Sequence, residues 1–228
     1  MECVFGLVGN GFAIVAADTS AVHSILVHKN NEDKIMLLDS HKLIAASGEP
    51  EECVTVSVQK RDPLTTAAAA NFTRGELATA LRKLNLLWIG SFFQTELFII
   101  FESFHVLCHA SVALQVDSKS LLCEHPEAGY DKEAGASLYY IDYIATLHKV
   151  DKGAFGYGSY FSLSTMDRHF RSDMSVEEAI ELVDKCITEI RSRLVIAPPN
   201  FVIKIVDKDG ARTHAWRQSV QDVTTASV

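Results

Sequence analysis

Short apolar runs separated by turn residues fill the first fifty positions of the chain. The run Phe12–Ala17 is continuously apolar, which is typical of a strand that is buried on both faces. The sequence Gly9-Asn10-Gly11 before it is a tight-turn signal, and the polar sequence Asp39-Ser40-His41 separates two later runs. Several short strands at hairpin spacing predict an antiparallel sheet. The expected strands are Cys3–Val8, Phe12–Ala17, Ser24–His28, Lys34–Leu38 and Lys42–Ala46.

Two segments have the apolar spacing of amphipathic helices. In the first, Thr73 and Glu76 have the spacing of a capping box, although the alanine-rich stretch Thr65–Asn71 leaves an earlier start open. In the second, Ser175 and Glu178 have the same spacing, and basic residues lie near the C-terminus, where the helix dipole favours positive charge. The apolar faces consist of Leu77, Ala80, Leu81 and Leu84 in the first helix and Ala179, Ile180, Val183, Ile187 and Ile190 in the second.

The last part of the chain returns to strands. Pro198-Pro199 stops the second helix, and Phe201–Val206 and Ala211–Trp216 are two strands around the turn Asp207–Gly210. Strands, helices and strands in this order predict an α+β fold in which helices cover antiparallel sheets. Because no repeat or linker interrupts the chain, we expect residues 1–228 to form a single domain.

Composition narrows the classes of protein to which the chain can belong. Among its 228 residues, 29 acidic and 21 basic side chains give a net charge of −8, which opposes nonspecific binding to nucleic acid or to an anionic membrane. Its five cysteines are an odd number without a CxxC pair, which favours reduced thiols over a disulfide scaffold. The acidic start lacks the basic region of a signal peptide, so an intracellular location is expected.

The segment Leu84–Val116 breaks the pattern because it is strongly apolar over its whole length. Its last part, Leu97–Val116, is long enough to span a membrane as a helix. Charged and polar side chains in the middle of such a helix cost several kcal/mol, so buried core or a poorly accommodated insertion is favoured over a membrane span. The side chains concerned are Glu102, His105, His109 and Gln115.

Candidate metal and cofactor sites in the sequence are weak. One cluster consists of His105, Cys108, His109, Cys123 and His125, but its spacing matches no compact zinc site. The turn Asp207–Gly210 lacks the third acidic residue and the closing glutamate of a calcium loop. Gly153, Gly156 and Gly158 do not follow the dinucleotide-binding pattern and do not lie between an expected strand and helix, so a close-packed turn is favoured. We therefore expect no metal and no cofactor.

Asp18 and Lys34 are candidates for catalytic chemistry. An aspartate that ends a buried strand, with a lysine after the next strand, can orient and tune a nucleophile. The alternative is a loop carboxylate and a solvated lysine, and the pattern alone favours this alternative. No nucleophile with an adjacent base emerges from the spacing of other residues.

Longer stretches of the sequence resemble one family. The segment Met1–Glu49, with Ala16-Ala17-Asp18 and the spacing to Lys34, resembles the opening of a 20S proteasome β subunit. Further stretches resemble the β type-2 members of that family in their plant versions: Leu64–Lys83, Ala128–Arg168 and Ala197–Arg212. The resemblance implies the N-terminal-nucleophile hydrolase fold, an αββα sandwich of two antiparallel sheets between helix layers.

The resemblance also assigns positions of the active site. Catalytic members use an N-terminal threonine whose own amine accepts the proton, with an aspartate and a lysine as helpers. Asp18 and Lys34 match the helpers, and Gly48 matches the oxyanion-hole glycine, but the nucleophile position falls on Glu2. No Gly-Thr processing point precedes it, and the first threonine of the chain is Thr19.

Two further positions of the active site also differ from the family pattern. The later serine and aspartate of that pattern fall on Tyr157 and about Leu194. The resemblance thus implies an inactive subunit, with Cys3 as a fallback nucleophile only if Met1 and Glu2 were removed.

The implied function is architectural. The chain would occupy a place in the β rings of a 28-subunit, four-ring particle, next to other proteasome β and α subunits, in the cytoplasm and nucleus. This particle degrades ubiquitinated proteins, and neither nucleic acid nor a membrane is an expected partner. Large obligate interfaces are apolar-rich, which fits a mean hydropathy of +0.11. The alternatives are an active N-terminal-nucleophile peptidase and a non-assembling variant with a membrane-associated segment.

Two stretches depart from the family pattern. Residues 49–62 are shorter than the expected amphipathic helix, and residues 84–126 stand where the family has a strand leading directly into Ala128. Closely matching flanks suggest alternative splicing or an error in the gene model as the hypothesis for the second stretch. We expect the loss of part of a helix and of one sheet strand, with Leu84–Ile89 as a candidate substitute strand.

Overall fold

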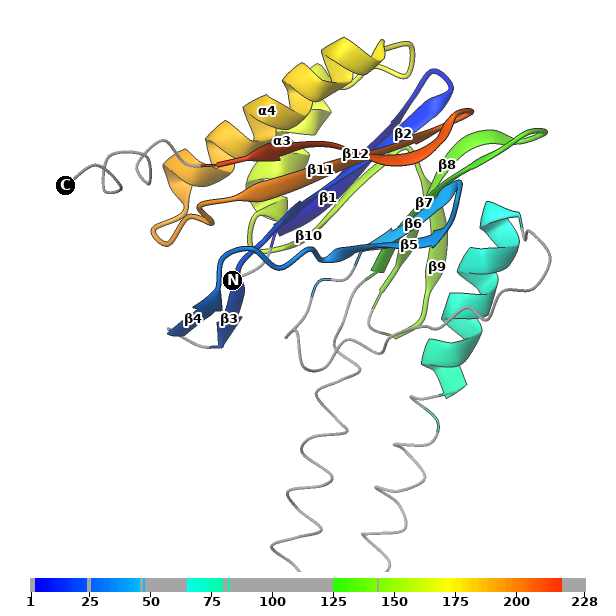
Figure 1. The fold of residues 1–228 in the computed structure, drawn as a ribbon, viewed down its shortest axis with the longest axis horizontal. Coiled ribbons are helices and arrows are strands. Elements are labelled where there is room, and N and C mark those ends of the chain that lie inside the picture. The colour runs from blue at the N-terminus through cyan, green and yellow to red at the C-terminus, as the bar shows by residue number, and fades with distance from the viewer. Residues whose placement is uncertain are drawn as a thin grey trace, which may run out of the picture.

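The chain folds as two antiparallel sheets that pack face to face with helices on both outer sides (Figure 1). The computed structural model describes residues 3–23, 26–45, 47, 65–79, 82, 125–142 and 144–218. The layer order is helix, sheet, sheet, helix, which confirms the α+β sandwich expected from the sequence. Segments from both ends of the chain contribute to the first sheet.

The first sheet has the strand order β10-β1-β2-β11-β12. Its central strand β2 is buried along its whole length, which explains why its sequence is apolar without alternation. The hairpin between β1 and β2 turns at Asn10-Gly11, where Gly11 has a φ of 83° that favours glycine. The strands are β1 (Cys3–Gly9), β2 (Phe12–Asp18), β10 (Lys152–Gly156), β11 (Phe201–Asp207) and β12 (Gly210–Arg217).

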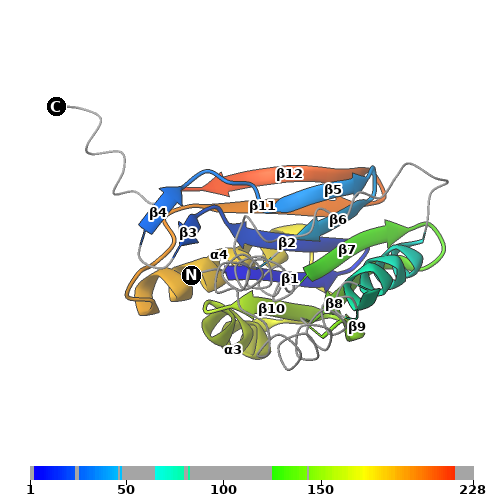
Figure 2. The same ribbon diagram turned by 90° about the horizontal axis from the view of Figure 1, so that it is seen from below.

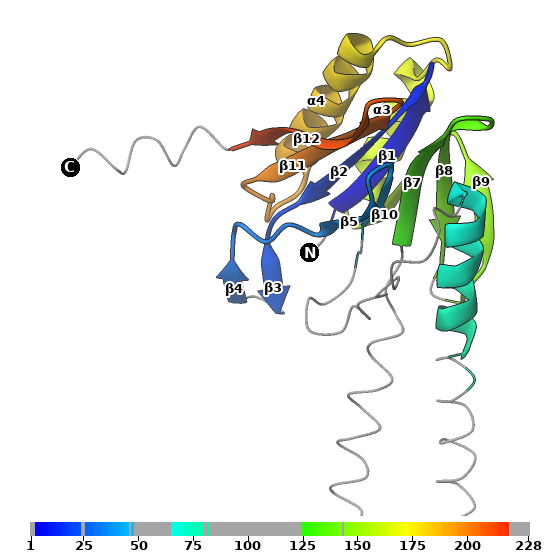
Figure 3. The same ribbon diagram turned by 45° about the vertical axis from the view of Figure 1, so that its right-hand side comes forward.

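The second sheet has the order β5-β6-β7-β8-β9 and follows the chain without crossovers. A separate two-stranded hairpin, β3 with β4, projects beyond the end of the sandwich (Figure 3). The strands are β5 (Ile35–Asp39), β6 (Lys42–Ala45), β7 (His125–Asp131), β8 (Gly135–Ile141), β9 (Leu147–Val150), β3 (Ala21–His23) and β4 (Leu26–Lys29).

Helices α3 (Ser159–His169) and α4 (Val176–Arg193) cover the outer face of the first sheet (Figure 2). A core cluster joins them to β1, β2 and β11. A second cluster fills the space between the two sheets, with Val15 and Leu138 among its fully buried members. The helix at residues 66–79 lies on the outer face of the second sheet, where Leu77 packs with Ile141 and Ala145.

The best sequence predictions concern elements with strong local signals. The structure confirms the first hairpin, the hairpin of β5 and β6, and the hairpin of β11 and β12 around its turn. Helix α4 is confirmed with its capping box, because the Ser175 side chain accepts from the Glu178 N–H and the Glu178 side chain accepts from the Ser175 N–H. Its buried face contains Leu182 and Cys186 in addition to four of the five expected positions, and the fifth, Ile180, is only partly buried.

Two local predictions are wrong and one is incomplete. The strand expected at Ser24–His28 is found from Leu26 onward as β4, but its partner β3 was not predicted. The capping box expected at Thr73 does not exist, because Thr73 lies in the middle of helix 66–79 and its hydroxyl donates to the Ala69 carbonyl. The Thr65 hydroxyl instead accepts from the Ala68 N–H, so the earlier start is correct. The glycines at 153–158 do lie between a strand and a helix, β10 and α3.

The expected loss of one sheet strand is also wrong. Strand β7 begins at His125 and pairs with β6 on one side and with β8 on the other, so this place in the second sheet is filled. The last residues of the atypical stretch therefore take part in regular pairing. The candidate substitute strand Leu84–Ile89, residues 49–62 and the apolar run Leu97–Val116 lie outside the described residues.

Candidate functional site

Asp18 and Lys34 form a buried ion pair at one end of the sandwich. Asp18 is the last residue of β2 in the first sheet, and Lys34 directly precedes β5 in the second sheet. The Lys34 ammonium donates to the two carboxylate oxygens at 3.0 and 3.1 Å, and the side chains are 6% and 0% exposed. The pair thus joins the two sheets and confirms that the two residues come together.

The Asp18 carboxylate also holds two backbone groups. Its Oδ1 accepts from the Cys3 N–H at 2.9 Å, and its Oδ2 accepts from the Ser20 N–H at 3.1 Å. Buried ion pairs are tolerated when further hydrogen bonds satisfy their remaining polar atoms, and the two N–H groups do this for Asp18. The carboxylate therefore fixes the start of β1 and the chain that follows β2 to the same point.

The hydroxyl groups next to this pair are fully buried or already engaged. Thr19 is fully buried, and its hydroxyl donates to the Asn30 carbonyl at 2.7 Å. The Ser20 hydroxyl is also buried, and it has no hydrogen-bond partner among the residues that the structure describes. Neither side chain can reach a peptide substrate in this conformation, so neither supplies a nucleophile.

Cys3 is the described residue nearest to the position that the resemblance assigns to the nucleophile. Its side chain is 1% exposed and sits against Gly158, where an added Cβ would overlap with the Cys3 sulfur. Burial, assisted by the neighbouring Asp18 charge, raises the pKa of the Cys3 thiol to about 12. Because the thiolate is the reactive form, this thiol is a packed core group and not a poised nucleophile. The contact also bears out the prediction of a close-packed turn at Gly158.

The other positions assigned by the resemblance fall in different surroundings. Tyr157 lies between β10 and α3 and is 64% exposed, and Leu194 is the residue that ends α4. A phenol and an aliphatic side chain supply neither a serine hydroxyl nor a carboxylate. Glu2 and Gly48 lie outside the described residues.

The described residues contain neither a set of metal ligands nor a helix that could cross a membrane. Among the described part of the chain, no three His, Cys, Asp or Glu side chains are arranged to hold a metal ion. Of the cluster considered from the sequence, His125 lies in β7, and the other four members fall outside the described ranges. No helix in the described residues is long and apolar enough to cross a membrane.

A family model described as proteasome subunit matches residues 2–67 and 105–206. The chain belongs to the proteasome subunit family. The matched ranges contain both members of the Asp18–Lys34 pair and nearly every strand of the two sheets. The unmatched residues 68–104 overlap the stretch 84–126 that the sequence analysis sets apart.

Curated plant proteins resemble the whole chain. It is 70% identical over 239 aligned residues to the Arabidopsis thaliana protein named proteasome subunit beta type-2-A, and the alignment covers 100% of both proteins. It is 58% identical to the rice protein named proteasome subunit beta type-2, over 95% of the chain and 91% of that protein. The yeast Saccharomyces cerevisiae protein named proteasome subunit beta type-4 is 27% identical over 93% of the chain. The family predicted from the sequence is therefore confirmed, including the type-2 branch after which these two plant relatives are named.

One unusual group escaped the sequence analysis. Glu127 is fully buried in the middle of β7, although its sequence position next to Pro126 and Gly129 resembles a loop. Glutamate is rarely buried, so residue type gave no signal. The only available hint was the family pattern, which places a strand directly before Ala128.

Proposed function

We propose that this chain is a non-catalytic, structural β subunit of a 20S proteasome core particle. The full-length identity to relatives named proteasome subunit beta type-2 supports the place in a β ring. Its partners are then the other β and α subunits of the four-ring assembly, in the cytoplasm and nucleus, and the whole of residues 1–228 acts as one domain.

The observation that carries the inactive state is an ion pair without a nucleophile. Asp18 and Lys34 have the geometry of helper residues around the first backbone N–H of β1. The residue that precedes this N–H is Glu2, whose carboxylate cannot replace a threonine hydroxyl beside a free amine. Gly48 completes the set of vestigial positions.

The fallback nucleophile has no support in the geometry. The Cys3 thiol is buried, and its pKa is raised to about 12, so it is protonated at neutral pH. Its N–H is also committed to Asp18. An active cysteine at this place would need both the thiol and a free amine in contact with substrate.

Two measurements on one preparation test the proposal. A tagged copy of the full chain is expressed in plant cells, and native gels show whether it enters a particle of core-proteasome size. The purified particles are then exposed to a peptide electrophile that captures N-terminal threonines, and each subunit is weighed intact. We expect incorporation, with adducts on other subunits and none on this chain.

Each of the two measurements tests a separate part of the proposal. Exclusion of the chain from the particle, with aggregation or degradation, contradicts the structural role and favours the non-assembling variant. An adduct on this chain contradicts the inactive state and favours the active peptidase. A Lys34→Met variant is a control, because an adduct that depends on the ion pair disappears when Lys34 is replaced, whereas nonspecific labelling persists.

A further inference from the structure

Helix 66–79 is attached to the second sheet at both of its ends. The Thr66 N–H donates to the two carboxylate oxygens of Asp131 at 2.9 and 3.1 Å, which places a negative charge at the N-terminus of the helix. The Thr66 side chain packs so closely on Gly129 that no Cβ would fit there. Near the other end, Leu77 packs against Ile141.

Between these attachments, the helix meets a buried carboxyl group. Glu127 is 0% exposed, and the register of β7 places it between Ile44 of β6 and Tyr139 of β8. Its Oε2 lies 3.2 Å from the Thr73 hydroxyl of the helix. Its Oε1 has no hydrogen-bond partner among the described residues. The carboxyl group thus lies in the interface between helix and sheet with one polar contact.

The hydrogen-bond geometry suits the protonated acid. The Thr73 hydroxyl has one hydrogen and lies 3.2 Å from both the Ala69 carbonyl and Glu127. When Glu127 is protonated, it donates to the Thr73 oxygen while Thr73 donates to the Ala69 carbonyl, so both contacts are made. When Glu127 is ionised, it can only accept, and the single hydrogen cannot serve both oxygens.

The charged groups around Glu127 do not offset its ionisation. The nearby Lys42 ammonium of β6 is paired with Asp39 of β5 at 2.7 Å. Burial raises the pKa of Glu127 more than any neighbour changes it: the Thr73 hydroxyl and Lys42 lower it, and Asp39 raises it. The pKa of Tyr139 is likewise raised, by burial and by the Asp131 and Glu127 carboxylates.

The charged side chains of the helix do not change this balance. Arg74 and Glu76 are exposed, away from the sheet. Burial is therefore the largest influence on Glu127 and raises its pKa from 4.5 to about 8.

We propose that Glu127 is a pH-dependent latch: its protonated carboxyl holds helix 66–79 on the second sheet, and loss of the proton loosens the docking of this helix. The rest of the sandwich is not affected, because α3, α4 and the first sheet lie on the far side of the second sheet. This role is independent of the proposed place in the proteasome, since it depends only on the contacts within the chain.

Hydrogen–deuterium exchange of the full chain tests the latch. Peptides from residues 66–79 and from α4 are followed at pH 6.5 and 8.5, with exchange times scaled for the base-catalysed intrinsic rate. In the unaltered chain we expect the helix to be protected about tenfold less at pH 8.5 than at pH 6.5. The reason is that Glu127 regains its ordinary pKa when the helix opens, so loss of the proton favours the open state. Helix α4 should stay more strongly protected than helix 66–79 at both pH values, because α4 opens only when the whole domain unfolds.

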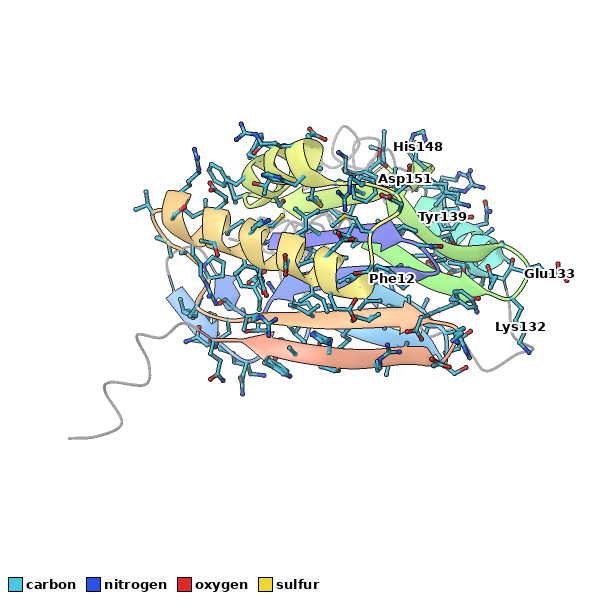
Figure 4. All side chains as sticks on the ribbon, turned by 90° about the horizontal axis from the view of Figure 1, so that it is seen from above. Phe12, Lys132, Glu133, Tyr139, His148 and Asp151 are labelled. Carbon is cyan, nitrogen blue, oxygen red and sulfur yellow. The ribbon has the colours of Figure 1, made fainter. Side chains whose placement is uncertain are left out.

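Matched variants assign the response to this carboxyl group. Glu127→Gln keeps the shape and cannot ionise, so helix 66–79 should be equally protected at both pH values. Glu133→Gln is the control, because Glu133 is exposed at the tip of the β7–β8 hairpin (Figure 4) and should leave the response unchanged. If Glu127→Gln does not fold, Glu127→Leu serves, since an apolar side chain suits the surroundings.

Three results would overturn the proposal. The first is an unaltered chain whose helix is equally protected at both pH values. The second is a Glu127 variant that keeps the loss of protection at pH 8.5. The third is a helix 66–79 whose protection equals that of α4 at both pH values, which would mean that it opens only with the whole domain and that no local latch exists.

Discussion

Replacing Asp18 with alanine tests whether the buried ion pair holds the two sheets together. The change leaves the Lys34 ammonium, 6% exposed, without its carboxylate. Removal of one partner from a buried pair costs about 3–5 kcal/mol. The N–H groups of Cys3 and Ser20 also lose their acceptor, at about 1–3 kcal/mol for each buried donor. Because these effects share one site they do not add, and we expect a loss of roughly 5 kcal/mol.

A loss of that size is decisive for a single domain, whose whole stability is about 5–15 kcal/mol. Lys34→Met should cost less than Asp18→Ala, because Asp18 keeps its two backbone donors. The double variant should cost less than the sum of the single variants, since it leaves no uncompensated charge. Glu189→Gln is the matched control, because it breaks the exposed pair with Arg193 and should cost less than about 1 kcal/mol.

Urea unfolding of the full chain at pH 7, followed by far-ultraviolet circular dichroism, measures these differences. The expected order of stability is Glu189→Gln, Lys34→Met and then Asp18→Ala as the least stable. A cost for Asp18→Ala as small as that for Glu189→Gln would refute the cross-sheet role. So would a double variant whose cost equals the sum, because the two charges would then not be coupled.

Three further predictions use other contacts. Burial raises the pKa of the Cys3 thiol to about 12, so iodoacetamide at pH 8 should leave Cys3 unmodified in the folded chain and alkylate it in urea. Peptide mass mapping detects the modification, and alkylation in the folded chain would contradict the burial of Cys3. Gly158→Ala should cost about 1–3 kcal/mol in urea unfolding because its Cβ overlaps with Cys3, and Cys3→Ala in the same chain should recover part of that cost; no recovery would mean that the clash lies elsewhere. The pKa of Glu127 is 4.5 in the unfolded chain and about 8 in the folded chain, so the folded chain holds the proton more tightly. The free energy of unfolding should therefore fall as the pH rises from 4.5 to about 8 and stay constant above that. The free energy of unfolding should change by about 5 kcal/mol in total between these pH values. Thermal unfolding at several pH values measures this change, and a Glu127→Gln variant with the same pH dependence would exclude this carboxyl group as the cause.

Elements with complete local signals could be predicted from the sequence. Helix α4 has a capping box, acidic residues in its first turn and basic residues in its last, so every local preference agrees with its buried face. The first hairpin combines an apolar strand with Asn10-Gly11, a turn that glycine favours. In both cases tertiary packing adds to a structure that the local sequence already specifies.

Helix α3 was missed because its local signals are weak. Its N-cap is Gly158, which has no side chain to cap it, and only Ser162 and Met166 are buried. Strand β7 contains proline and glycine and depends on pairing with β6 and β8 from distant parts of the sequence. Such pairing cannot be read from a short window, so α3 was not predicted and the strand at the place of β7 was wrongly expected to be lost.

The sequence singled out Asp18 and Lys34, but it did not predict that the two side chains form a buried ion pair. Asp18 and Lys34 were singled out because one ends a buried strand and the other follows the next strand. Their contact depends on the packing of two sheets, and the pattern alone therefore favoured a solvated lysine. The structure shows the opposite, since the lysine is buried and the carboxylate accepts from two backbone N–H groups as well.

These contacts show what keeps the Asp18–Lys34 pair in place independently of the residue at position 2. The Asp18 carboxylate binds the backbone N–H of Cys3, and this contact is the same whatever side chain stands at residue 2. A change of side chain at position 2 therefore leaves this hydrogen bond in place, whereas replacing Asp18 or Lys34 alone removes one charge of a buried ion pair. If the proposed inactive state holds, the Asp18–Lys34 pair is expected to remain after the nucleophile is gone, because a large penalty for losing the pair is avoided only when both of its members change together.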